Sequence, residues 1–201
     1  DYAPPAYWID SVDLTFDLDP QKTRVLNKMR VRRNADVAVQ ALKLDGEDLN
    51  LSRVLVNGQG CSFKMENSKL VLDNLPEDFE LEIFTTCNPN KNTQLMGLYV
   101  SNESFFTQCE AEGFRRITYF LDRPDVMAVF TVTLRADKSA YPVLLSNGNL
   151  VEQGILEDGR HFAKWFDPFK KPAYLFALVA GQFVCREQTI TSRAGNTHLL
   201  Q

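Results

Sequence analysis

The residues best suited to chemistry lie in one stretch, from Thr107 to Val126, which reads TQCEAEGFRRITYFLDRPDV. Gln108 and Glu110 stand two positions apart, and in an extended segment such side chains leave the backbone on the same face. They present one amide carbonyl and one carboxylate together. An ammonium group offers three hydrogen-bond donors and no acceptor. The pair therefore predicts a site for a positively charged amine.

A short helix is expected to follow this pair, near residues 112–121. Phe114, Ile117 and Leu121 fall at the i, i+3, i+7 spacing of one apolar helix face. Pro124 then ends the pattern, because proline lacks the amide donor that a helix needs.

An alternative role for Glu110 is to cap the first turn of that helix, where acidic side chains interact favourably with the helix dipole. Glu112, nearer the expected helix start, is the better capping candidate. The other polar side chains of the helix are expected to be structural, with Asp122 as an ion-pair partner. They are Arg115, Arg116 and Tyr119.

Other kinds of catalytic site find little support. The two histidines, His161 and His198, are far apart, and no H-E-x-x-H or Cys/His cluster has metal-ligand spacing, so no metal site is expected. No G-x-S-x-G or Gly-rich phosphate loop occurs. Glu110 and Glu112 could form the acid pair of a glycosidase. That reading is weaker, because the two side chains crowd each other on a strand and diverge on a helix.

The elements around this stretch read as β-strands. Val12, Leu14, Phe16 and Leu18 alternate with polar residues, and residues 25–31 repeat the pattern after a turn, which predicts a hairpin with one wet face. The basic residues of the second strand are expected to pair across the hairpin with acidic residues of the first. The basic set is Arg30, Arg32 and Arg33, and the acidic set is Asp13, Asp17 and Asp19.

Short apolar runs broken by turn residues continue along most of the chain. Asn57-Gly58, Asp158-Gly159 and Asn147-Gly148 supply the positive φ that tight hairpin turns require. The continuous run Tyr174–Ala180 predicts a central strand buried on both faces. We therefore expect a mostly β fold: antiparallel, multi-stranded and sandwich-like, in a single β domain over residues 1–201.

Composition excludes several classes of protein. The net charge is −4 and the pI is near 5.3, so no nucleic acid or anionic membrane partner is expected. No apolar run approaches the roughly 18 residues of a membrane span. Four scattered cysteines without a C-x-x-C pair fit reduced, mostly buried thiols of a cytoplasmic protein.

Several segments together resemble a known family. The stretch that contains Q-x-E, the later run KPAYLFALVAG, the opening SVDLTFDL and the segment LDGEDL resemble the N-terminal domain of the bacterial aminopeptidase N family, the zinc-dependent alanyl aminopeptidases. The resemblance covers essentially the whole chain. It implies a saddle-shaped β domain that packs on a thermolysin-like catalytic domain. It also implies that Gln108 and Glu110 hold the free amino terminus of a peptide substrate.

The zinc-binding residues of that family are absent from this sequence, and the resemblance places the catalytic domain beyond Gln201. Zinc is therefore expected in the full-length enzyme and not in this chain, which alone should be inactive. Met65-Glu66-Asn67 spells the end of the family's G-x-M-E-N substrate motif, but the required glycine is missing and a hairpin tip is expected there.

Two functions follow from these observations. The first is the substrate-recognition domain of a cytoplasmic bacterial zinc aminopeptidase that removes N-terminal residues from peptides. The alternative is a non-catalytic β-sandwich module that binds protein or carbohydrate. An H-E-x-x-H shortly beyond Gln201 in the parent reading frame would decide for the first.

Overall fold

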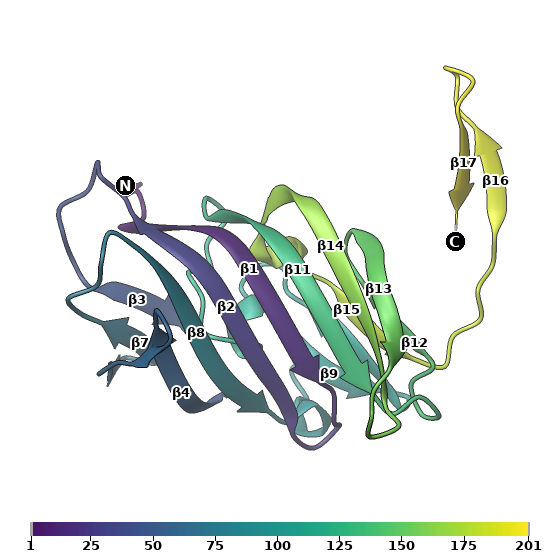
Figure 1. Cartoon of the computed structure of the whole chain (residues 1–201), viewed down its shortest axis with the longest axis horizontal. Helices are drawn as coiled ribbons and strands as arrows, with labels where there is room; N and C mark the ends of the chain where they lie inside the picture. The colour runs from purple at the N-terminus through teal and green to yellow at the C-terminus, as the bar shows by residue number, and fades with distance from the viewer. Residues whose placement is uncertain (1, 201) are drawn as a thin grey trace.

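Figure 1 shows the chain as a computed structural model, which describes residues 2–200. Strands form most of it, and the mostly β, largely antiparallel fold expected from the sequence is confirmed. The strands are β1 Tyr7–Asp17, β2 Thr23–Arg33, β3 Leu42–Asp45, β4 Asn50–Val56, β5 Gln59–Gly60, β6 Lys64–Glu66, β7 Lys69–Leu72, β8 Asp78–Cys87, β9 Gly97–Ser101, β10 Ser104–Gln108, β11 Met127–Ala136, β12 Val143–Ser146, β13 Asn149–Ile155, β14 His161–Pro172, β15 Leu178–Gly181, β16 Gln188–Thr191 and β17 Thr197–Leu200. Three single 3₁₀ turns are η1 Pro89–Lys91, η2 Phe114–Arg116 and η3 Ala173–Leu175.

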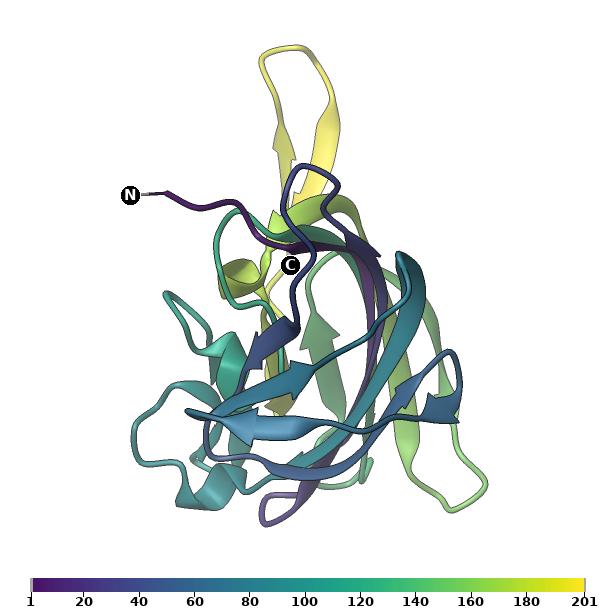
Figure 2. The same ribbon diagram turned by 90° about the vertical axis from the view of Figure 1, so that its left-hand side faces the viewer.

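The largest sheet has eight strands in the order β13-β14-β11-β1-β2-β8-β4-β5. All its neighbouring strands are antiparallel except β1 and β11, which run parallel. The predicted alternation holds in β1 and β2, where Val12, Leu14 and Phe16 are buried, as are Val25 and Met29. Figure 2 shows how strongly these long strands bend.

The core lies between this sheet and two smaller ones, a four-stranded sheet in the order β12-β15-β10-β9 and a three-stranded sheet in the order β3-β7-β6. Phe114 of η2 is fully buried at its centre, with ring centroids 4.9 Å from Phe120, 5.3 Å from Phe176 and 6.1 Å from Phe130. Edge-to-face contacts of this kind add to the stabilisation that burial provides. Phe114 therefore ties the segment after β10 to the core of the protein.

The helix expected at residues 112–121 is wrong: the structure has only the 3₁₀ turn η2. The backbone of Phe120 instead exchanges hydrogen bonds of 2.8 and 3.0 Å with Asp45, the last residue of β3. Phe114, Ile117 and Phe120 are all fully buried. Their spacing reflects burial in an irregular segment, which a helical period of apolar residues does not distinguish from a helix.

The basic residues of β2 form ion pairs, as expected, but their partners are not the acidic residues that the sequence predicted. Arg30 pairs with Asp78 at 3.3 Å, Arg32 with Asp10 at 2.8 Å, and Arg33 with Glu77 at 3.7 Å. Register is the reason. Asp13 lies opposite Lys28, and Asp17 lies opposite Arg24.

Two further expectations can be compared with the structure. The run 174–180 forms the end of η3 and most of the short strand β15, which is an interior strand of its sheet. The strand is shorter than predicted, and the run is not buried on both faces, because Leu175 and Ala177 are exposed. Met65 and Glu66 end β6 at a hairpin whose turn residues, Asn67 and Ser68, have φ of 50° and 63°. The expected hairpin tip is confirmed.

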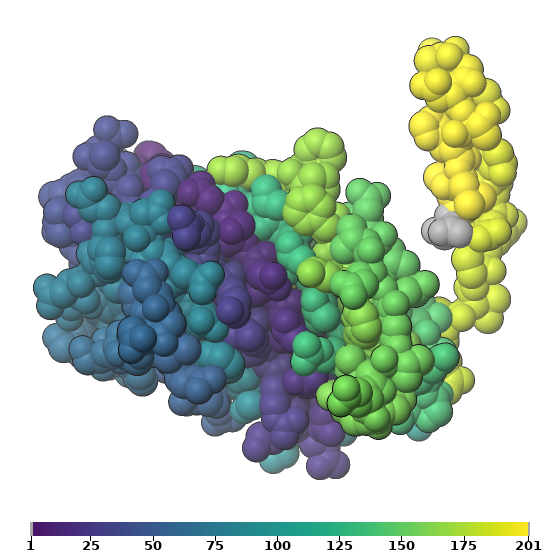
Figure 3. Space-filling model, viewed as in Figure 1, coloured from purple at the N-terminus to yellow at the C-terminus, as the bar shows by residue number. Residues whose placement is uncertain are grey.

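The last two strands, β16 and β17, form a hairpin that stands away from the rest of the protein in Figures 1 and 3. Its residues are exposed along both strands. No helix within residues 2–200 is long and apolar enough to cross a membrane.

Candidate functional site

Gln108 is the last residue of β10, where it pairs with Gly97 of the edge strand β9, and Glu110 lies in the turn that follows. Both residues are exposed, whereas Cys109 between them is buried. The Gln108 side-chain amide donates a hydrogen bond of 3.2 Å to the backbone carbonyl of Glu110. Gln108 thereby links the two residues of the pair.

The backbone after Glu110 folds back tightly on β9 and β10. The peptide bond between Glu110 and Ala111 is cis. The Gly113 amide then donates a 2.8 Å hydrogen bond to the Cys109 carbonyl. A Cβ atom at Gly113 would lie 2.3 Å from the Gln108 carbonyl oxygen, so only glycine fits there without a shift.

A second glycine completes this close packing. Gly97 has φ of +73°, a conformation that residues with a side chain rarely adopt. A Cβ atom there would lie 2.6 Å from the Cβ of Arg116. The loop that carries Glu110 is thus held between two glycines, and sequence reasoning did not single out either of them.

The Arg115–Asp122 ion pair predicted from the sequence is present. The Arg115 guanidinium donates to the Asp122 carboxylate at 3.1 Å and to the Asp122 backbone carbonyl at 3.1 Å, and the Arg115 amide donates to the same carboxylate at 3.1 Å. Burial raises the pKa of the Asp122 carboxyl above its ordinary value, and the hydrogen bonds from Arg115 oppose that shift. The pair closes the segment 115–122 into one unit.

Arg116 is fixed by residues that are distant in the sequence. It pairs with Glu47 at 2.6 Å and also with Asp48. These contacts span almost 70 positions of the chain, and the sequence carries no signal for them. Arg115 and Arg116 therefore both anchor the turn that follows Glu110, each through its own acidic partners.

The capping roles weighed for the two glutamates do not occur. The residue before η2 is Gly113, which has no side chain to cap the turn, and the first turn contains no acidic residue. Glu112 forms an ion pair with Arg115 at 3.3 Å. Glu110 forms no side-chain hydrogen bond or ion pair with any residue in the described range 2–200, so its exposed carboxylate is free to bind a ligand.

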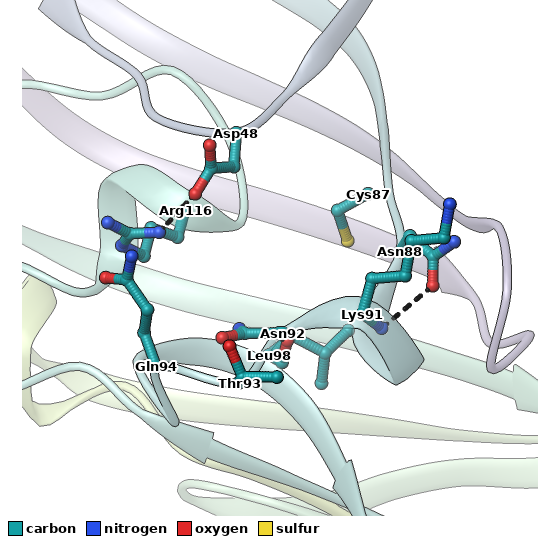
Figure 4. Close-up of a pocket in the computed structure, with 9 residues that line it drawn as sticks. All are labelled: Asp48, Cys87, Asn88, Lys91, Asn92, Thr93, Gln94, Leu98 and Arg116. Carbon is teal, nitrogen blue, oxygen red and sulfur yellow. Dashed lines mark hydrogen bonds and ion pairs between the residues drawn. The ribbon is translucent and has the colours of Figure 1, made fainter.

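A pocket of about 340 Å³ lies beside Arg116 (Figure 4). Arg116 and Asp48 face it from one side, and the turn at Asn88 and Lys91 borders the other. Neither Gln108 nor Glu110 lines it. The candidate pair therefore sits on an open surface, and a closed site would need a second surface opposite it.

The surface around residues 108–114 is polar. Phe114 is buried, and the exposed side chains are Gln108, Glu110, Ala111 and Glu112. The surface is polar because every large apolar side chain of this segment points into the core.

A zinc ion does not fit the residues of this structure. Within residues 2–200, no group of three or more His, Cys, Asp or Glu side chains has an arrangement that could hold a metal. Zinc prefers three or four such ligands in a tetrahedral set. The carboxylate of Glu110 with the Gln108 amide is suited to an amine by hydrogen bonding and charge, a different chemistry.

Comparison with known proteins defines the class. The family model of the Peptidase M1 N-terminal domain matches residues 5–175, so the chain belongs to this family. Among curated proteins, the chain is 53% identical over 203 residues to aminopeptidase N of Escherichia coli (strain K12), across all of this chain and 23% of that protein. The resemblance read from the sequence is confirmed.

Solved structures agree. Legionella pneumophila aminopeptidase A, determined in complex with aspartic acid, matches with a TM-score of 0.92 and 33% identity, across 99% of this chain and 24% of that one. An M1 zinc metallopeptidase from Deinococcus radiodurans shares the fold at a TM-score of 0.80 and 17% identity, across 96% of this chain and 46% of that one. The chain spans about a quarter of the length of its curated relatives.

Proposed function

We propose that this chain is the substrate-recognition domain of a zinc aminopeptidase, in which Gln108 and Glu110 bind the free amino terminus of a peptide. The observation that carries the proposal is the Glu110 carboxylate. It is exposed, it has no partner within residues 2–200, and it stands on a loop fixed by close packing. The 53% identity to an aminopeptidase N supports the same substrate class.

The physical task explains the residue types. An enzyme that removes one residue at a time must recognise the α-ammonium that marks the end of a peptide. A carboxylate binds it through a charge-assisted hydrogen bond, which contributes about 1.5–3 kcal/mol. Gln108 supplies a neutral second acceptor when its side chain turns from the Glu110 carbonyl to the ligand. When the site encloses the ammonium group, the distance from that group to the scissile peptide bond is fixed.

The rest of the machinery belongs to other parts of the whole protein. We propose that a thermolysin-like catalytic domain outside this chain holds the zinc and covers the open surface at Glu110, and that this chain alone has no peptidase activity. The bacterial relative and the four free thiols support a place in the bacterial cytoplasm.

The test is steady-state kinetics of the full-length protein on an amino-acid arylamide. Glu110→Gln keeps the shape of the side chain and removes its charge, so we expect kcat/KM to fall by about 10- to 150-fold. Much of the loss should appear in KM, because the amine is held in both the ground state and the transition state.

Glu112→Gln is the matched control. Glu112 carries the same charge on the same loop and is also exposed, but its carboxylate pairs with Arg115. We expect its kcat/KM to stay within about threefold of the wild type, since exposed ion pairs contribute little. Equal losses in the two variants would overturn the assignment of Glu110.

A further inference from the structure

A groove of about 590 Å³ lies on the outer face of the large sheet, the face turned toward the viewer in Figures 1 and 3. Residues of strands β11, β1, β2 and β8 and of the start of β4 line it. The register sets five residues side by side as cross-strand neighbours, in the order Arg135, Asp17, Arg24, Thr86 and Asn50. All five line the groove, and Lys22 joins them from the turn before β2.

The charges of this groove are unbalanced. Three cations, Lys22, Arg24 and Arg135, line it together with one carboxylate, Asp17. That carboxylate is already matched, because Arg160 donates to it at 3.0 Å and Arg135 forms an ion pair with it at 3.9 Å, which leaves Lys22 and Arg24 as the unpaired cations. Lys22 and Arg24 form no ion pair with any residue in the described part of the chain, 2–200.

The other cations on the outer face of β2 all have ion-pair partners. Lys28 pairs with Glu82, Arg30 with Asp78, and Arg32 with Asp10, all on the same outer face. The free cations are therefore confined to the end of β2 that borders the groove. This is a local feature in a protein whose net charge is −4.

Neutral groups that can donate hydrogen bonds surround these cations. Thr86 and Ser52 offer hydroxyls and Asn50 offers an amide. Arg53 adds a further cation nearby, with its guanidinium 4.1 Å from the ring centroid of Phe84, which forms part of the groove. Stacking on an aromatic ring holds a guanidinium in place and leaves its edge able to bind an anion.

We propose that this groove binds a small multivalent oxyanion, one that carries phosphate or carboxylate groups. Guanidinium and ammonium groups form their strongest hydrogen bonds with such oxygens. Free cations, adjacent hydroxyls and a hollow of ligand size occur together only at this end of the sheet face among the groups described above. The groove shares no residue with the Gln108–Glu110 loop, so the proposal stands independently of the amine site.

Isothermal titration of this chain with inorganic phosphate, and separately with citrate, at constant ionic strength tests the proposal. We expect saturable binding of at least one anion, and the stronger of the two identifies the preferred oxygen chemistry. The double variant Lys22→Gln, Arg24→Gln should weaken that binding by at least about tenfold. Both side chains are exposed and unpaired, so the variant should fold, which circular dichroism checks.

Arg30→Gln is the control, because Arg30 lies on the same strand and face but is paired with Asp78. It should bind the anion as the wild type does. Two results would overturn the proposal: no saturable binding of either anion below about 10 mM, a concentration that already corresponds to very weak affinity, or an equal loss of binding in Arg30→Gln, which would indicate general charge attraction.

Discussion

Replacing Gly113 by alanine would place a methyl group where the backbone already stands. The new Cβ would lie 2.3 Å from the carbonyl oxygen of Gln108 and 2.9 Å from the Cα of Cys109. Carbon and oxygen atoms approach to about 3.3 Å at closest, so the loop must move by roughly 1 Å. The φ of Gly113 is −81°, which any residue adopts, so the whole cost is steric.

The size of that cost follows from the contacts. The atoms in the way are backbone atoms of β10 and its extension, which cannot rotate aside as a side chain can. Forcing an extra carbon into a packed region costs about 1–3 kcal/mol. For a chain of this length, about 2 kcal/mol lowers the melting temperature by about 4–8 °C. Thermal unfolding followed by circular dichroism measures it.

Gly60→Ala is the matched control, because no atom lies within 4 Å of a Cβ built at Gly60. Its free energy of unfolding should stay within about 0.5 kcal/mol of the wild type. If Gly113→Ala melts at the same temperature as Gly60→Ala, the close packing described for the Glu110 loop is wrong. In the full-length protein, a 1 Å displacement of Glu110 should lower kcat/KM by about a hundredfold.

Three other outcomes follow from packing and charge. Phe114→Ala should lower the free energy of unfolding by about 3–5 kcal/mol in urea titrations, and a cost below about 1 kcal/mol would contradict its central place in the core. The hydrogen bond from Arg123 holds the pKa of Asp125 below its ordinary value of 3.8, so the stability that Asp125 contributes is present above that pH and lost as pH falls through the lower folded value. Asp125→Asn should therefore have a lower melting temperature than the wild type at pH 7 and the same melting temperature near pH 2. Equal melting temperatures at both pH values would refute the pairing. A thiol reagent should label exposed Cys185 in the native chain and reach buried Cys109, whose pKa burial raises, only on unfolding; rapid native labelling of Cys109 would count against the structure.

Much of the fold is readable from the sequence because burial alternates along β1 and β2 as the pleat requires. For Gln108 and Glu110 the sequence predicted a shared face, and the structure adds that both side chains are exposed and that Cys109 between them is buried. The helix near residues 112–121 could not be excluded in this way. Phe114 and Ile117 have helical spacing, but tertiary contacts with Asp45 decide the backbone.

The supports of the candidate site were less visible. Arg115 and Asp122 are close in sequence, and their pairing was predicted. Arg116 depends on Glu47 and Asp48, which only the folded chain brings near. The need for glycine at position 113 likewise arises from the return of the loop onto β10, a contact that has no local sequence signal.

The central claim is that the Glu110 carboxylate binds a substrate ammonium, and the most direct test measures that preference itself. The full-length protein and its Glu110→Gln variant are each assayed on an amino-acid arylamide and on the matching arylamide that lacks the amine. The quantity compared is the ratio of the two kcat/KM values. We expect Glu110→Gln to lower that ratio by about tenfold or more, because the charged hydrogen bond to the amine is lost. An unchanged ratio, even with lower overall activity, would contradict the account.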